Sequence, residues 1–102
     1  MKLDELFSVR DKVVLITGGS RGIGEMIAEG FIANGAKVYI TSRNESDIKN
    51  TAQRLKDSYG GFCEAIRSDI SNIDGVKELF NEFSKKENYL DVLVNNAGAV
   101  WG

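Results

Sequence analysis

Apolar residues along this chain form two alternating patterns. Short, nearly continuous apolar runs predict strands that are covered on both faces. Between them lie longer stretches in which apolar residues recur every three or four positions, which predicts amphipathic helices. The predicted strands cover residues 12–17, 37–41, 62–68 and 90–94.

The first predicted helix covers about residues 22–34. Its apolar face is expected to carry Ile23, Ile27 and Phe31, which recur at every fourth position. Gly35 stands where a helix commonly ends, because glycine adopts the left-handed conformation that terminates a helix.

The second and third predicted helices have clear candidate caps. Asn44 or Ser46 can cap the second, and the sequence Ser71-Asn72-Ile73-Asp74 is a candidate capping box for the third. A turn is expected at Tyr59-Gly60-Gly61. The expected buried side chains are Ile48, Ala52 and Leu55 in the second helix and Val76, Leu79, Phe80 and Phe83 in the third.

The alternation of strands and helices predicts the α/β class. Parallel strands need crossover connections, so a doubly wound parallel sheet with helices on both faces is expected. With right-handed crossovers and a Rossmann topology, the strand order is 3-2-1-4, and the sheet stops at the fourth strand. The ligand crevice then lies beyond the carboxyl ends of strands one and four.

Composition and charge narrow the functional classes. The 102 residues carry a formal net charge of −2, no histidine and one cysteine, Cys63. A chain with this net charge is not attracted electrostatically to nucleic acid or to an anionic membrane. A single cysteine cannot form an intrachain disulfide. The N-terminus has no secretory pattern and no apolar run reaches membrane-spanning length, so a cytoplasmic protein with no membrane partner is expected.

The segment most informative about function follows the first predicted strand directly. Residues 17–24 read Thr-Gly-Gly-Ser-Arg-Gly-Ile-Gly, with Gly18, Gly22 and Gly24 in the spacing G-x-x-x-G-x-G. A strand that enters a glycine-rich turn and then a helix brings backbone N–H groups to a phosphate. The structural alternative is that these glycines only permit a tight connection.

Two other motifs also follow predicted strands: Asp69-Ile70 after the third and Asn95-Asn96-Ala97-Gly98 after the fourth. Together with the glycine turn they resemble the short-chain dehydrogenase/reductase superfamily. Within it, the chain is similar to 3-oxoacyl-(acyl-carrier-protein) reductases, and residues 98–102 are similar to the branch with the rhamnolipid-pathway ketoacyl reductases. The resemblance implies an NADP(H)-dependent oxidoreductase that reduces a carbonyl, such as a 3-oxoacyl thioester, to the secondary alcohol.

The resemblance also implies that residues 1–102 are the N-terminal, cofactor-binding half of one Rossmann domain. The family's catalytic Ser and Tyr-x-x-x-Lys pair would follow Gly102, because none of Tyr39, Tyr59 and Tyr89 has a lysine four residues later. No catalytic residue is therefore assigned. The family also implies a homo-oligomer, often a tetramer.

Cofactor choice depends on the end of the second predicted strand. Members that prefer NAD place a carboxylate there for the ribose hydroxyls, but this chain has Ser42. Arg43 and Arg21 can then bind a 2′-phosphate, unless both are ordinary surface charges. Glu45 and Asp47 are rival ribose acids, although they also suit the first turn of the second helix.

The remaining candidates have open structural alternatives. By resemblance, Asp69 accepts a hydrogen bond from the adenine amino group, whereas its structural alternative is a helix cap, a role for which Ser71 is available. The resemblance also implies that one of Asn95 and Asn96 braces the sheet against the glycine turn, while Asn96, Ala97 and Gly98 line the adenosine ribose. Thr17 is expected to tie the glycine turn to the fourth strand. The candidate cofactor-binding residues are Gly18, Ser20, Arg21, Gly22, Ile23, Gly24, Ser42, Arg43, Asp69, Ile70, Asn96, Ala97 and Gly98.

Two rival interpretations remain open at this point. The chain can be a non-catalytic nucleotide-binding module, or an inactive truncated fragment. The outer edge of the fourth strand would be bare beside Val92 and Val94, which favours aggregation. The resemblance to the reductases makes the oxidoreductase the preferred interpretation.

Overall fold

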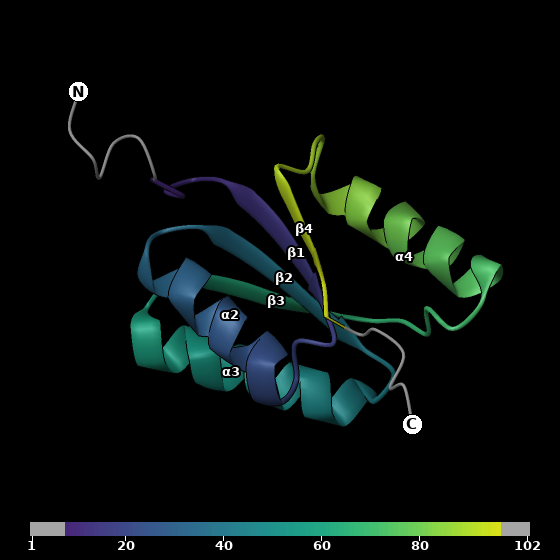
Figure 1. Cartoon of the computed structure of the whole chain (residues 1–102), viewed down its shortest axis with the longest axis horizontal. Helices are drawn as coiled ribbons and strands as arrows, with labels where there is room; N and C mark the ends of the chain where they lie inside the picture. The colour runs from purple at the N-terminus through teal and green to yellow at the C-terminus, as the bar shows by residue number, and fades with distance from the viewer. Residues whose placement is uncertain (1–7, 97–102) are drawn as a thin grey trace.

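The structure is a computed structural model that describes residues 8–96. Four strands and three helices alternate along the chain (Figure 1). The strands are β1 (Val13–Thr17), β2 (Lys37–Ser42), β3 (Phe62–Arg67) and β4 (Val92–Asn95). The helices are α2 (Gly22–Ala33), α3 (Glu45–Tyr59) and α4 (Ile73–Lys86).

The four strands form one parallel sheet in the order β3-β2-β1-β4. Residue Leu15 in the middle of β1 lies opposite Tyr39 of β2 and Leu93 of β4. All five residues of β1 are buried, as expected for an inner strand with both faces covered. The predicted fold class and strand order are therefore confirmed.

Helices cover both faces of the sheet (Figure 1). On one face, α2 and α3 pack over a cluster that includes Val14 and Ile16 of β1. On the other, Leu79 and Phe83 of α4 pack with Leu15 and its neighbours. Alternate residues of β1 thus feed two separate cores, because successive side chains of a strand point to opposite faces.

The buried face of α2 differs from the predicted one. Gly24, Ala28 and Ile32 are buried, whereas Ile23 is 68% exposed. On the face of its first two turns that packs on the sheet, the helix carries only the small residues Gly24 and Ala28. Ile27 and Phe31 are half-buried and pack at the margin of the core.

The caps of α3 and α4 are both asparagines. Asn44 accepts a hydrogen bond from the Asp47 N–H at 3.0 Å, which selects Asn44 from the two predicted candidates. Asn72 caps α4 by accepting from the Gly75 N–H at 2.8 Å. The expected cap role of Ser71 is wrong, because its hydroxyl donates to Asp69 instead.

The predicted apolar faces of α3 and α4 are largely confirmed. Ile48, Ala52 and Leu55 of α3 are buried. In α4, Leu79 and Phe83 are buried, but Phe80 is 40% exposed. Phe80 lies one residue beyond Leu79, so the helix turns it toward the margin of the contact.

Which face of α2 packs on the sheet can be tested by one substitution at two positions. Ile32→Ala should lower the free energy of unfolding by about 2–5 kcal/mol, because Ile32 is buried. The matched change Ile23→Ala should alter it by no more than about 0.5 kcal/mol. Urea unfolding without cofactor measures both values, and a larger loss at Ile23 would contradict the observed packing.

Candidate cofactor-binding site

The loop between β1 and α2 is a tight turn that glycine makes possible. Gly18 and Gly22 have positive φ angles of 71° and 56°, a region that other residues rarely adopt. The Gly18 N–H donates to the Thr41 carbonyl oxygen at 2.8 Å, so the turn is attached to β2. Thr51 of α3 attaches the next part of the turn, because its hydroxyl donates to the Ser20 carbonyl oxygen at 3.2 Å.

Gly24 is the point of closest approach between α2 and the turn. A Cβ at this position would lie 2.2 Å from the Gly18 carbonyl oxygen and 2.6 Å from Nδ2 of Asn96. Asn96 Nδ2 itself donates to that carbonyl at 3.3 Å. Asn96 therefore braces the glycine turn from the end of β4.

Thr17 joins β1 to β4 at the same level. Its hydroxyl donates to Oδ1 of Asn95 at 2.9 Å, and the same hydroxyl oxygen accepts from the Asn96 N–H at 3.1 Å. The prediction that Thr17 ties the turn to the fourth strand is confirmed. These contacts hold the glycine turn, β1 and β4 in one arrangement.

The N-terminus of α2 differs from those of α3 and α4. Its N-cap residue, Arg21, makes no side-chain hydrogen bond to the first turn, whereas Asn44 and Asn72 cap the other two helices of residues 8–96. The first N–H groups of a helix have no partner within it and carry a partial positive charge. This end of α2 suits an anion.

A groove of about 500 Å³ opens at the carboxyl ends of the strands. It is the side of the sheet on which the crevice was predicted. Five of the predicted site residues line it: Gly18, Ser42, Arg43, Asp69 and Ile70. Thr17, Thr41, Ser68, Ser71 and Asn95 complete the lining.

Asp69 presents a carboxylate at this groove. Its pKa is lowered, chiefly by hydrogen bonds from the hydroxyl and the backbone N–H of Ser71. Arg43 and Arg67 add a smaller effect in the same direction. Asp69 is therefore an anion that accepts hydrogen bonds at neutral pH.

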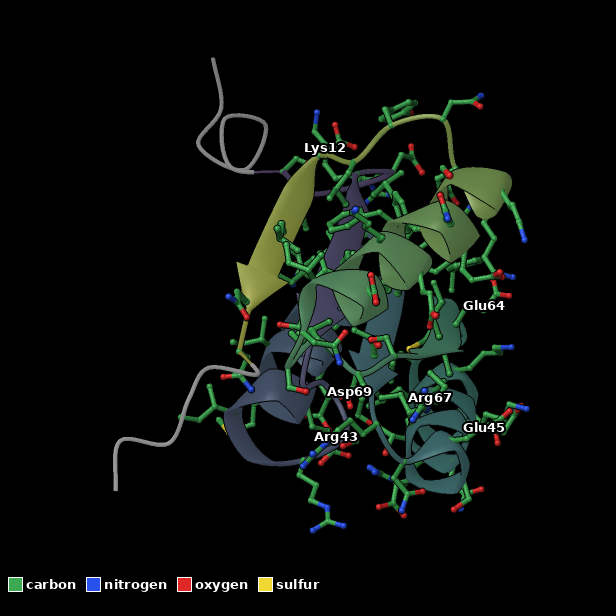
Figure 2. All side chains as sticks on the ribbon, turned by 90° about the vertical axis from the view of Figure 1, so that its right-hand side faces the viewer. Lys12, Arg43, Glu45, Glu64, Arg67 and Asp69 are labelled. Carbon is green, nitrogen blue, oxygen red and sulfur yellow. The ribbon has the colours of Figure 1, made fainter. Side chains whose placement is uncertain are left out.

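The two predicted arginines lie at either side of the start of α3. Arg21 reaches from the glycine turn to Asp47 in the first turn of α3, with Nη2 2.9 Å from Oδ2. Arg43 precedes that helix and lies at the same end of the molecule as Asp69 (Figure 2). Both guanidinium groups therefore come from separate segments to one end of the sheet.

Some predicted residues do not line the groove. Arg21, Gly22, Ile23 and Gly24 lie at the start of α2, with Ser20 in the turn before it. Asn96 has the bracing contact described above, and its contact with a ribose stays a prediction. Ala97 and Gly98 lie outside the described residues.

The structure adds polar groups that sequence reasoning did not select. Thr41 and Ser68 are buried and share a hydrogen bond between their hydroxyl groups, which links β2 to the end of β3. Thr51 anchors the glycine turn from α3. Thr41 and Ser68 could have been selected because they are polar residues at the ends of apolar strands. No pattern in the neighbouring sequence distinguishes Thr51.

A protein-family model described as short chain dehydrogenase matches residues 12–102. The chain belongs to the short-chain dehydrogenase family. The family that the motifs in the glycine turn and after β3 and β4 predicted is therefore confirmed.

Among curated relatives, the chain is 45% identical over 96 residues to the rhamnolipids biosynthesis 3-oxoacyl-[acyl-carrier-protein] reductase of Pseudomonas aeruginosa. That match covers 94% of this chain and 37% of the relative. The chain thus spans little more than a third of the length of this relative.

Two solved structures extend the comparison. The Pseudomonas aeruginosa RhlG/NADP active-site complex matches with a TM-score of 0.86 and 44% identity, over 91% of this chain and 37% of that chain. L-sorbose reductase from Gluconobacter frateurii, complexed with NADPH and L-sorbose, matches with a TM-score of 0.85 and 34% identity. This second match covers 90% of this chain and 35% of the L-sorbose reductase chain.

The described part of the chain lacks two other kinds of feature. No helix within residues 8–96 is long and apolar enough to cross a membrane. The same residues contain no group of three or more Cys, Asp or Glu side chains arranged to hold a metal ion.

The close approach at Gly24 predicts that one added methyl group strongly lowers the stability of the fold. Gly24→Ala should lower the free energy of unfolding by about 1–3 kcal/mol, because the added Cβ meets backbone that has no room to move. In the same helix, Gly30→Ala meets no atom within 4 Å and should be neutral or stabilise by about 0.5–1 kcal/mol. Equal effects in urea unfolding would contradict this account.

Proposed function

We propose that the protein binds NADP(H) at the groove beyond the carboxyl ends of β1, β2 and β3. The observation that carries the proposal is the uncapped N-terminus of α2, which the turn at Gly18 and the close packing of Gly24 hold beside the groove. Backbone N–H groups at such a helix end bind phosphate without any charged side chain.

In this proposal the residues from Gly18 to Gly24 hold the diphosphate of the cofactor. Gly22 has no side chain to obstruct the ligand, and nothing within 4 Å of its Cβ position fills the space. Ser20 and Ile23 belong to the same stretch. The exposure of Ile23, which the packing of α2 does not explain, suits a residue that covers a bound nucleotide.

The choice of NADP(H) over NAD(H) follows from the charges around the end of β2. Ser42 brings no carboxylate to the groove, so a 2′-phosphate meets no negative charge at this position. Arg43 lines the groove and offers a planar set of N–H donors that suits phosphate oxygens. Arg21 can supply a second guanidinium by exchanging its exposed Asp47 partner for the phosphate.

The adenine is proposed to lie near Asp69 and Ile70. The Asp69 carboxylate is ionised and accepts hydrogen bonds, as an adenine amino group requires. Ile70 lines the groove beside it and offers an apolar contact. Asn96, Ala97 and Gly98 are proposed to line the adenosine ribose.

The proposed reaction is the reduction of a carbonyl to a secondary alcohol, with a 3-oxoacyl thioester as the substrate class. Support comes from the relative that is named a 3-oxoacyl-[acyl-carrier-protein] reductase. The bound nicotinamide supplies the hydride, and the role of residues 8–96 is to bind and orient it. The Ser, Tyr and Lys expected for proton transfer are not assigned to any residue of this chain, and the proposed assembly is a homo-oligomer.

The cofactor proposal is tested by removing one guanidinium. Arg43→Ala should weaken NADPH binding about tenfold or more, because a charge-assisted hydrogen bond to the phosphate is lost, and should change NADH binding less than about twofold. Isothermal titration of the full-length protein with each cofactor measures both constants.

Arg10→Ala is the matched control for this experiment. Arg10 lines a different groove, between the C-terminal ends of α2 and α3, so its loss changes the net charge equally without touching the proposed site. Equal weakening of NADPH and NADH by Arg43→Ala would show that Arg43 does not bind the 2′-phosphate. Absence of saturable binding to the unaltered protein would refute the proposed function itself.

A further inference from the structure

The hydrogen-bonded ladder between β2 and β3 continues one step beyond its last backbone pair. Ser42 lies opposite Arg67 at the end of the ladder, and the Ser68 N–H donates to the Ser42 carbonyl oxygen at 2.9 Å. The next carbonyl along the chain, just after β2, belongs to Arg43. It accepts a hydrogen bond from the side chain of Arg67, with Nε 3.1 Å from the oxygen.

The other end of this short connection is fixed by the cap of α3. Oδ1 of Asn44 accepts from the Asp47 N–H at 3.0 Å and from the Ser46 hydroxyl at 2.9 Å. Arg43 therefore lies between a capped helix and the guanidinium of Arg67. Arg43 and Asn44 alone join β2 to α3, so these contacts hold the backbone at both ends of the connection that carries the Arg43 side chain.

Two carboxylates lie close enough to Arg67 to interact with its charge. Arg67 contributes to a lowered pKa of Asp69, after the larger effect of the Ser71 hydrogen bonds and that of Arg43. It also contributes to a lowered pKa of Glu45, for which Lys49 is the main cause. Figure 2 shows Arg43, Glu45, Arg67 and Asp69 at one end of the molecule, opposite Lys12. The Asp69 carboxylate interacts with both guanidinium groups and so reduces the repulsion between them, whereas Glu45 is paired chiefly with Lys49.

We propose that Arg67 is a positioning residue for cofactor choice: its Nε–H holds the Arg43 carbonyl so that the Arg43 guanidinium faces the 2′-phosphate. This inference rests on the proposed NADP(H) site and adds a residue that is outside the glycine turn and the β2–α3 connection. Arg67 itself does not line the groove. Its effect on the cofactor therefore passes through Arg43.

The first test measures dissociation constants of NADPH and NADH for Arg67→Ala in the full-length protein. Loss of one hydrogen bond that positions Arg43 should weaken NADPH binding about fivefold and leave NADH within about twofold. Arg67→Met, which keeps the aliphatic stem but has no N–H, should give the same change in the ratio. Arg10→Ala again controls for the lost charge.

A double-mutant cycle separates positioning from direct contact. In the Arg43→Ala background, Arg67→Ala should change NADPH binding less than about twofold, because no guanidinium remains to be positioned. A full fivefold loss in that background would overturn the inference, since Arg67 would then act on the phosphate directly.

The outcomes for the inference and for the proposed function are distinct. If the unaltered protein prefers NADPH and Arg43→Ala removes that preference, the proposed site stands. Unchanged NADPH binding in both Arg67→Ala and Arg67→Met, or equal weakening of both cofactors, then overturns the role of Arg67 alone. Melting temperatures near that of the unaltered protein would show that each variant is folded, as expected for an exposed side chain.

Discussion

The start of α2 lies so close to the turn after β1 that there is no room for a side chain at Gly24. This contact, together with the hydrogen bond from Asn96 to Gly18, fixes the position of the helix N-terminus. The direction of its free N–H groups follows from that position. The proposed binding of the diphosphate depends on this contact, because a helix displaced outward by one side chain would direct these N–H groups elsewhere.

The parallel topology determines what gathers beside that helix end. The carboxyl ends of β1, β2 and β3 come to one edge, so residues far apart in the sequence meet there. Ser42 and Asn95 end β2 and β4, and Asp69 follows β3, yet all three line one groove. The sheet thus collects polar groups from motifs that are each weak alone. It also places Arg67 against Arg43, a proximity that exists only because β2 and β3 are neighbours.

The strands and their order could be predicted because continuous apolar runs alternate with helical patterns. This alternation is compatible with only a few sheet topologies. The buried face of α2 could not be predicted, because Gly24 and Ala28 are small and contribute little to a hydrophobic pattern. The neighbouring Ile23 is strongly apolar and therefore indicated the wrong face. Asn72 and Ser71 are both good caps one residue apart, and only the hydrogen bond to Gly75 distinguishes them. The groove-lining candidates followed from strand ends, whereas Thr51 and Arg67 act through contacts that no local pattern records.

The most direct measurement is a crystal structure of the full-length protein with bound NADP⁺. The account predicts the diphosphate at the N-terminus of α2, within hydrogen-bonding distance of backbone N–H groups between Gly18 and Gly24, and the 2′-phosphate beside Arg43. Nucleotide bound in the groove between the C-terminal ends of α2 and α3, or bound anywhere with the N-terminus of α2 left free, would contradict it.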